Sequence, residues 1–173
     1  MSAVDELLAR HRAFLAARSH QGLLGARPKL RVAVVTCMDA RIDLTGALGL
    51  QPGDVHVVRN GGGLVTDDVL RSLVVSQRLL GTVEIMVVMH TDCGMQKLHD
   101  AELAGRIAAE TQVEVPFAFG GFTDLHAQLR DSVERLRTCP WLPHRTAVRG
   151  FVYNVDTGGI DELAERVDTE ANR

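Results

Sequence analysis

The apolar residues of this chain are concentrated in short runs rich in valine, and each run is bounded by polar or turn-forming residues. Short β-branched runs of this kind are typical of strands that are covered on both faces of a sheet. We expect strands at residues 30–36, 54–59, 83–90 and 147–155. The last of these alternates between apolar and polar residues, so we expect it to lie nearer an edge of the sheet.

Between these runs, apolar residues recur at the three- and four-residue spacing of amphipathic helices. Helices are expected at residues 3–18, 66–81, 101–110 and 123–137. The alternation of strands and helices predicts an α/β fold with a mainly parallel central β-sheet flanked by helices. The length suits a single domain over residues 1–173, made of an N-terminal helical arm at 1–28 and an α/β core at 29–173.

Composition and charge exclude several classes of function. The chain is 46% hydrophobic and 24% charged, its formal charge is −3, and its lysines and arginines form no basic cluster. These are the proportions of a soluble globular protein, and binding to nucleic acid is not expected. Charged residues interrupt the apolar ones near the N-terminus. We therefore expect neither a secretory signal nor a membrane span, and we predict a cytoplasmic protein.

Two of the three cysteines lie at or beyond the ends of predicted strands, where sites form in α/β proteins. Cys37 follows the first strand, His90 ends the third, and Cys93 lies three residues beyond His90. If these strands are neighbours, two thiols and an imidazole meet at one edge of the sheet, and zinc prefers such a donor set. Cys139 lies far along the chain and is a poor fourth ligand. An odd number of widely spaced cysteines also argues against a disulfide scaffold.

An aspartate and an arginine follow Cys37 at alternate positions. In an extended segment, residues 37, 39 and 41 point to the same side, so Asp39 can reach the metal or the water bound to it. Arg41 can hold the Asp39 carboxylate with two parallel hydrogen bonds and keep it ionised. Released from Arg41, Asp39 can become a fourth ligand and close the site. The glycine run at 61–63 lacks the pattern of a phosphate loop, and we expect it to let the backbone pass close to this pocket.

Three motifs together resemble those of the β-class carbonic anhydrases: CMDAR at 37–41, RNGG at 59–62 and HTDC at 90–93. The likeness extends from about residue 30 to residue 95, and RGFVYNVDTG near the C-terminus is similar to the last strand of the family. The resemblance implies reversible hydration of carbon dioxide to bicarbonate and a proton by zinc-bound hydroxide. The residue roles that carry over are zinc ligands, one ion per subunit (Cys37, His90 and Cys93), a catalytic pair (Asp39 and Arg41) and a substrate pocket (Asn60, Gly61 and Gly62).

The resemblance also implies a homodimer or a dimer of dimers, in which the partner subunit lines part of each active cleft and the N-terminal helix reaches across the interface. One position departs from the family pattern, because Gly61 stands where many relatives carry alanine. This change widens or loosens the pocket but removes no chemical group. Two thiolates already neutralise the zinc, so its bound water should ionise at a higher pH than in a three-histidine site. Activity is therefore expected to rise toward alkaline pH.

Three other functions are left open by the sequence. A thiol phosphatase or arsenate reductase also places a cysteine after a strand with an arginine nearby. Here, however, only three residues separate Cys37 from Arg41, and Asp39 among them would repel phosphate. A closed zinc site with Asp39 as permanent fourth ligand would be structural, in a binding or regulatory protein. The same open site also suits hydrolysis of carbonyl sulfide or carbon disulfide, which relatives of this family carry out.

Overall fold

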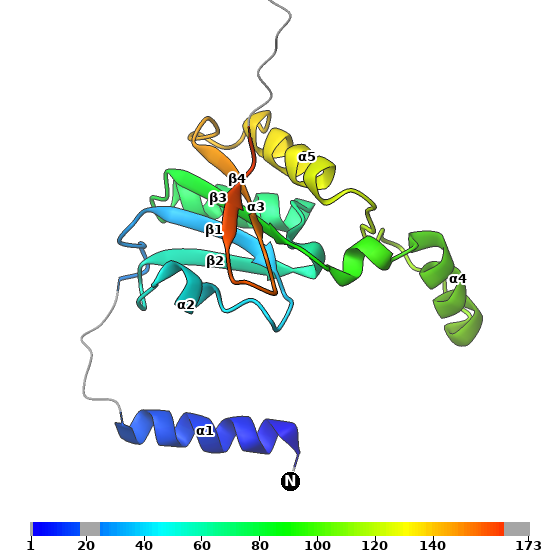
Figure 1. The fold of residues 1–173 in the computed structure, drawn as a ribbon, viewed down its shortest axis with the longest axis horizontal. Coiled ribbons are helices and arrows are strands. Elements are labelled where there is room, and N and C mark those ends of the chain that lie inside the picture. Colours follow the sequence, from blue (N-terminus) through cyan, green and yellow to red (C-terminus); the bar gives the residue numbers. More distant parts are fainter. Residues whose placement is uncertain (1, 18–24, 165–173) are drawn as a thin grey trace, which may run out of the picture.

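The computed structural model describes residues 2–17 and 25–164 of the chain, and its centre is a five-stranded sheet (Figure 1). The strand order is β2-β1-β3-β4-β5; the first four strands are parallel and β5 is antiparallel to β4. The strands are β1 (Val32–Cys37), β2 (Val55–Asn60), β3 (Glu84–His90), β4 (Val148–Tyr153) and β5 (Ile160–Glu162). This sheet confirms the prediction of a mainly parallel α/β fold.

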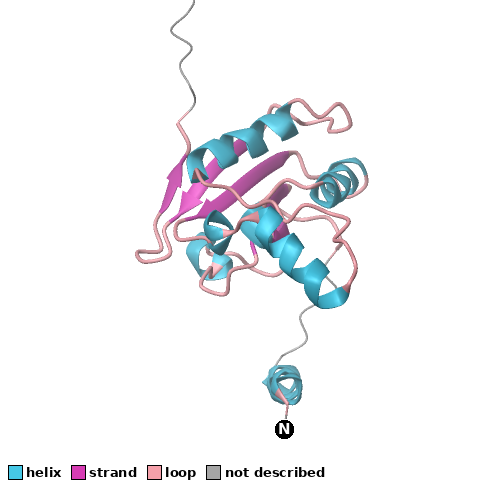
Figure 2. Ribbon diagram, turned by 90° about the vertical axis from the view of Figure 1, so that its right-hand side faces the viewer, coloured by secondary structure: helices cyan, strands magenta, loops and turns pink. Residues whose placement is uncertain are grey.

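Five α-helices accompany the sheet in the described part of the chain: α1 (Ala3–Ala17), α2 (Leu44–Leu48), α3 (Asp67–Arg78), α4 (Asp100–Thr111) and α5 (Leu125–Arg137). In Figure 1, α3 lies behind the sheet and α2 lies in front of it. Figure 2 shows the sheet edge-on, with helices on either side. Arg135 of α5 donates to the Val65 carbonyl at the start of α3, and Arg78 of α3 donates to the Trp141 carbonyl beyond α5. These contacts connect the start of α3 to the end of α5, and the end of α3 to the segment that follows α5.

The two strands that carry the predicted ligands lie inside the sheet and are buried on both faces. β1 pairs with β2 and β3, and β3 pairs with β1 and β4. Val35 of β1 and Val87 of β3 are fully buried, together with Leu73 of α3 and Leu129 of α5. A strand buried on both faces has no polar side to show, which explains why these runs are continuously apolar.

The short helix α2 and the short strand β5 were not predicted. The helix α2 and the strand β5 have five and three residues, too few to produce a periodic pattern. The strand β4 lies next to the edge of the sheet, as its alternating sequence predicted, and β5 pairs with it as the edge strand. A tight turn creates this pairing: the Asn154 side chain accepts hydrogen bonds from the backbone N–H groups of Asp156 and Thr157.

The helix α1 buries none of its residues against the rest of the described chain. Its apolar side chains are exposed by 49–63% of their surface (Val4, Leu7, Leu8, Phe14 and Leu15). The predicted helix extended to residue 18, which lies outside the described residues. None of the helices that the structure describes has both the length and the apolar character needed to cross a membrane.

Candidate metal centre

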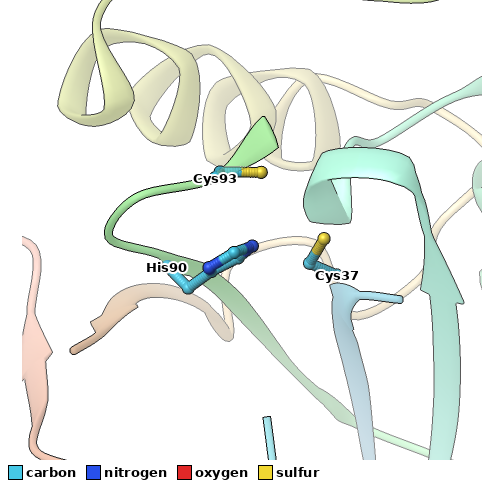
Figure 3. A group of neighbouring side chains, drawn as sticks. All are labelled: Cys37, His90 and Cys93. Atoms are coloured by element: carbon cyan, nitrogen blue, oxygen red, sulfur yellow. The ribbon is translucent and has the colours of Figure 1, made fainter. Parts of the chain in front are cut away.

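Three predicted ligands meet where β1 and β3 end (Figure 3). Cys37 is the last residue of β1, His90 is the last residue of β3, and Cys93 follows in the loop that leads to the short turn at Gly94–Lys97. Their ligand atoms lie within 4.8 Å of one another, and all three residues are buried. No other group of three candidate ligands occurs in the described part of the chain. The predicted convergence of two thiols and an imidazole is therefore confirmed.

The tautomer of His90 leaves one ring nitrogen free for a metal. Its Nδ1 lies 2.9 Å from the Thr91 carbonyl oxygen, which can only accept a hydrogen bond, so Nδ1 carries the proton. Its Nε2 is buried and has no hydrogen-bond partner among the described residues. Burial lowers the pKa of His90, which keeps the ring neutral. A neutral imidazole with its second nitrogen fixed by a carbonyl is the usual arrangement of a metal-bound histidine.

The two thiols complete a donor set that fits zinc. Burial raises the pKa of the Cys93 thiol to about 11, and the neighbouring Cys37 adds to the rise. A bound cation reverses this preference, because it stabilises the thiolate directly. Two backbone donors are already in place for the charged form: Gly62 N–H lies 3.3 Å from Cys37 Sγ, and Met95 N–H is directed at Cys93.

The glycine run after β2 brings the backbone against Cys37. Gly62 and Gly63 have φ angles of +82° and +66°, which only glycine adopts without strain. A Cβ atom on Gly63 would lie 3.0 Å from the backbone nitrogen of Cys37, so a larger residue would push the strand away. The Asn60 side chain bonds both the N–H and the carbonyl of Leu64, at 2.9 and 2.8 Å, and thereby closes the loop.

The structure leaves room at Gly61, the position where the sequence departs from the family pattern. A Cβ atom added there would meet Met95 Sδ at 3.5 Å, which is an ordinary van der Waals contact. Contact of a substrate with Asn60, Gly61 and Gly62 stays a prediction.

Asp39 and Arg41 form the predicted pair, but not in the predicted way. The strand ends at Cys37, and residues 38–43 turn instead of continuing extended. The Asp39 carboxylate accepts the backbone N–H of Arg41 at 2.9 Å, Nε at 3.0 Å and Nη2 at 2.8 Å. The pair is therefore brought together by a turn that the aspartate itself stabilises, and not by the alternation of side chains along a strand.

This pairing orients one carboxylate oxygen toward the ligands. Asp39 Oδ2 lies 3.8 Å from the free Nε2 of His90. The hydrogen bonds from Arg41 hold the pKa of the Asp39 carboxyl far below its usual range, so the group is ionised at neutral pH. An ionised acceptor next to the free position of a metal can accept a hydrogen bond from water there, or can bind the metal itself.

Two further residues, for which no role was predicted, support this site. Arg59 donates to the carbonyl oxygens of Cys37 and Asp39, both at 2.8 Å, and so fixes the backbone that carries the ligand and the carboxylate. Asp92, between two ligands, accepts a hydrogen bond from Arg41 Nη1 at 2.9 Å. Both residues lie inside the quoted motifs, RNGG and HTDC, but Cys37 and Asp39 are 20 or more residues from Arg59, and Arg41 is 51 residues from Asp92, so no local pattern reveals these contacts.

Comparisons with known proteins agree with this geometry. The family model described as carbonic anhydrase matches residues 32–114. β-Carbonic anhydrase 1 of Mycobacterium tuberculosis is 40% identical over 94% of this chain and 99% of its own length. Carbon disulfide hydrolase of Acidianus is 37% identical over 83% of this chain and 82% of its own length. A crystal structure of carbonic anhydrase from Streptococcus mutans superimposes with a TM-score of 0.88 and 41% identity, covering 95% of this chain and 99% of that one.

Proposed function

Since the chain belongs to the β-class carbonic anhydrase family, we propose that it catalyses the zinc-dependent, reversible hydration of carbon dioxide to bicarbonate and a proton. One observation carries the proposal. The Nε2 of His90, which has no hydrogen-bond partner among the described residues, lies beside two buried thiols, and a fixed, ionised carboxylate oxygen lies 3.8 Å from it. Three protein ligands leave one position of a tetrahedral zinc free, as a catalytic site requires.

The residues around the proposed metal have different roles. Cys37 and Cys93 as thiolates and His90 as a neutral imidazole would hold one zinc ion per chain. Zinc, when bound, would supply a Lewis acid that lowers the pKa of coordinated water. Asp39 would accept a hydrogen bond from that water and orient it, because its carboxylate has no other freedom while Arg41 holds it.

The ligand charge predicts how activity depends on pH. Two thiolates neutralise the dication, so the pKa of the water should lie higher than in a site with three neutral histidines. Activity should then rise from neutral toward alkaline pH. If Arg41 released Asp39, the same carboxylate would become a fourth ligand and close the site, so the pair also decides how often the site is open.

The comparison with relatives supports carbon dioxide as the substrate. The β-carbonic anhydrase of Mycobacterium tuberculosis shares more identity with this chain, over more of both lengths, than the Acidianus carbon disulfide hydrolase. The two substrates are both small, linear and apolar, so the same ligand set can serve either. Measuring both substrates on one preparation separates these functions.

We extend the proposal to a homodimer or a dimer of dimers. The apolar side chains of α1 are at least 49% exposed, and a row of such residues normally marks a surface that another molecule covers. Sedimentation equilibrium of the full chain should give twice or four times the 18.8 kDa of one chain.

The test is stopped-flow hydration of carbon dioxide by the zinc-loaded protein, from neutral to alkaline pH. Asp39→Ala should lower kcat/KM by about a hundredfold, the range expected for losing a group that assists proton transfer. Asp68→Ala is the matched control, because it removes an exposed aspartate whose partner is Arg71 on the surface of α3. This control should keep the wild-type rate.

Three outcomes would contradict the proposal in different ways. Hydration no faster than the buffer, together with turnover of carbon disulfide, would assign the site to the sulfur substrates. Failure with both substrates, in protein that holds one zinc, would indicate a structural metal. A hydration rate that does not change with pH would contradict the prediction drawn from the charge of the ligands.

A further inference from the structure

Arg41 is held from two sides, and only one of them involves Asp39. Among the described residues, its side chain makes four hydrogen bonds, two to each of two aspartates. Nε and Nη2 donate to the Asp39 carboxylate at 3.0 and 2.8 Å. Nη1 donates to Asp92 Oδ2 at 2.9 Å, and Nη2 donates to the Asp92 backbone oxygen at 3.0 Å. The guanidinium therefore bridges the segment after β1 to the loop after β3.

Asp92 is itself fixed in place. Its second carboxylate oxygen accepts a hydrogen bond from Lys97 Nζ at 2.8 Å, so both oxygens have cationic partners. Its backbone has a φ of +50°, which is uncommon for a residue with a side chain but is tolerated by aspartate and asparagine. Figure 3 shows the loop from His90 to Cys93 in which this residue lies. Uncommon backbone angles of this kind are concentrated at functional sites.

The contribution of these contacts is orientation rather than stability. The side chains of Arg41, Asp92 and Lys97 are exposed by 45%, 54% and 75%. Ion pairs this exposed add little to the free energy of unfolding. A guanidinium bound to Asp39 alone, however, can turn together with that carboxylate as one unit. A second anchor on the other loop removes this freedom, and positioning of this kind is what catalysis needs.

We propose that Asp92, supported by Lys97, is a positioning residue that fixes the Arg41 guanidinium so that Asp39 faces the free position of the metal without occupying it. This inference rests on the proposed function, because it assigns Asp92 a part in keeping that site open. Loss of the Asp92 side chain lets Arg41 and Asp39 move together, and Asp39 then competes with other ligands for the metal.

The first experiment measures the open position directly, without turnover. Cobalt(II) replaces zinc, and azide binding is followed by the change in the visible spectrum at one fixed pH. Asp92→Gly removes the side chain and accepts the positive φ, whereas Asp92→Asn keeps an oxygen for Arg41 and the same backbone preference. Azide affinity should fall about tenfold in Asp92→Gly and less than about threefold in Asp92→Asn, in proportion to the fraction of sites that Asp39 closes.

The second experiment asks whether Asp92 acts through Asp39. In an Asp39→Ala background no carboxylate can close the site, so adding Asp92→Gly should no longer change azide affinity. In the zinc enzyme with Asp39 present, Asp92→Gly should lower kcat/KM by the same factor as azide affinity, because both quantities report the fraction of sites that are open. An unchanged azide affinity in Asp92→Gly overturns the proposal. So does a fall of equal size with and without Asp39, because Asp92 would then merely hold the ligand loop.

Asp92→Gly is interpretable only if it keeps one cobalt per chain. If it does not, Asp92→Asn combined with Lys97→Met removes both charges and keeps the backbone preference. That double variant should lower azide affinity by about threefold, and no change would overturn the proposal. Failure of the proposed function is distinguishable, since a wild-type protein that does not hydrate carbon dioxide can still show, or fail to show, this azide cycle.

Discussion

Two regions of this molecule contain the same chemical groups and differ in what surrounds them. At the metal centre, Asp39 pairs bidentately with Arg41 beside the buried Cys37. On the side formed by α5, β4 and β5, Glu162 pairs bidentately with Arg149 at 2.7 and 2.6 Å. Cys139 on this side is buried, with 5% of its surface exposed. By distance alone, the second pair is the tighter one.

The difference lies in the direction that each carboxylate faces and in the strands that each cysteine follows. Asp39 Oδ2 is 3.8 Å from a buried ring nitrogen, whereas the Glu162 side chain is 47% exposed at an edge strand. Cys139 follows a helix, while Cys37 ends a strand whose neighbour ends in His90. A thiol and an ion pair become a site only where the sheet brings a second set of donors to them.

Replacing the cysteines gives the largest expected contrast. Cys37→Ala should lose stoichiometric zinc and fall to the hydration rate of the metal-free protein, because two remaining ligands cannot hold the ion tightly. Cys139→Ala should keep one zinc and the wild-type rate, with a modest loss of stability from the small cavity. Metal analysis and stopped-flow hydration of both variants check this. Stoichiometric zinc in Cys37→Ala would contradict the assignment of Cys37 as a metal ligand.

Replacing the arginines gives an intermediate effect. Lysine keeps the charge but cannot make two parallel hydrogen bonds, so Arg41→Lys should lower kcat/KM by about tenfold. Arg149→Lys makes the same chemical change in the pair with Glu162 and should leave kcat/KM within about twofold of wild type. Both variants are measured by stopped-flow hydration at saturating zinc. Equal losses would mean that the position of the pair is unimportant.

The smallest expected effect is a change in Tm at alkaline pH, and it tests how burial of the Cys93 thiol affects stability. The pKa of Cys93 is raised in the folded, metal-free protein to about 11, above its ordinary value of 9.0. The folded state therefore keeps the Cys93 proton up to a higher pH than the unfolded state does. The folded state loses stability relative to the unfolded state as pH rises from 9.0 to about 11. The Tm of the metal-free protein should fall by a few degrees between pH 9 and 11, and zinc should abolish the fall.

Cys93→Ala is the control for this measurement, because other groups also titrate in the same range. Its Tm should depend less on pH than that of the wild type when both lack zinc. Identical slopes for the two proteins would show that burial of this thiol does not couple folding to pH.

The sequence determined the parts of this protein that depend on local pattern. Continuous valine-rich runs predicted β1 and β3 as buried strands, and Cys37, His90 and Cys93 could be assigned to one edge because parallel strands end together. The glycine run at 61–63 predicts a close approach of the backbone to the pocket, and Gly62 and Gly63 adopt the positive φ angles that only glycine takes without strain.

Tertiary structure alone decided the features that join distant segments. The turn that brings Arg41 onto Asp39, the support of Arg59 under that turn, and the bridge to Asp92 all depend on where loops meet after folding. The pairing of β5 with β4 likewise depends on a hairpin too short to form a pattern. Periodicity reports which face of an element is buried, but a hydrogen bond between two loops leaves no period in the chain, so only the folded arrangement reveals it.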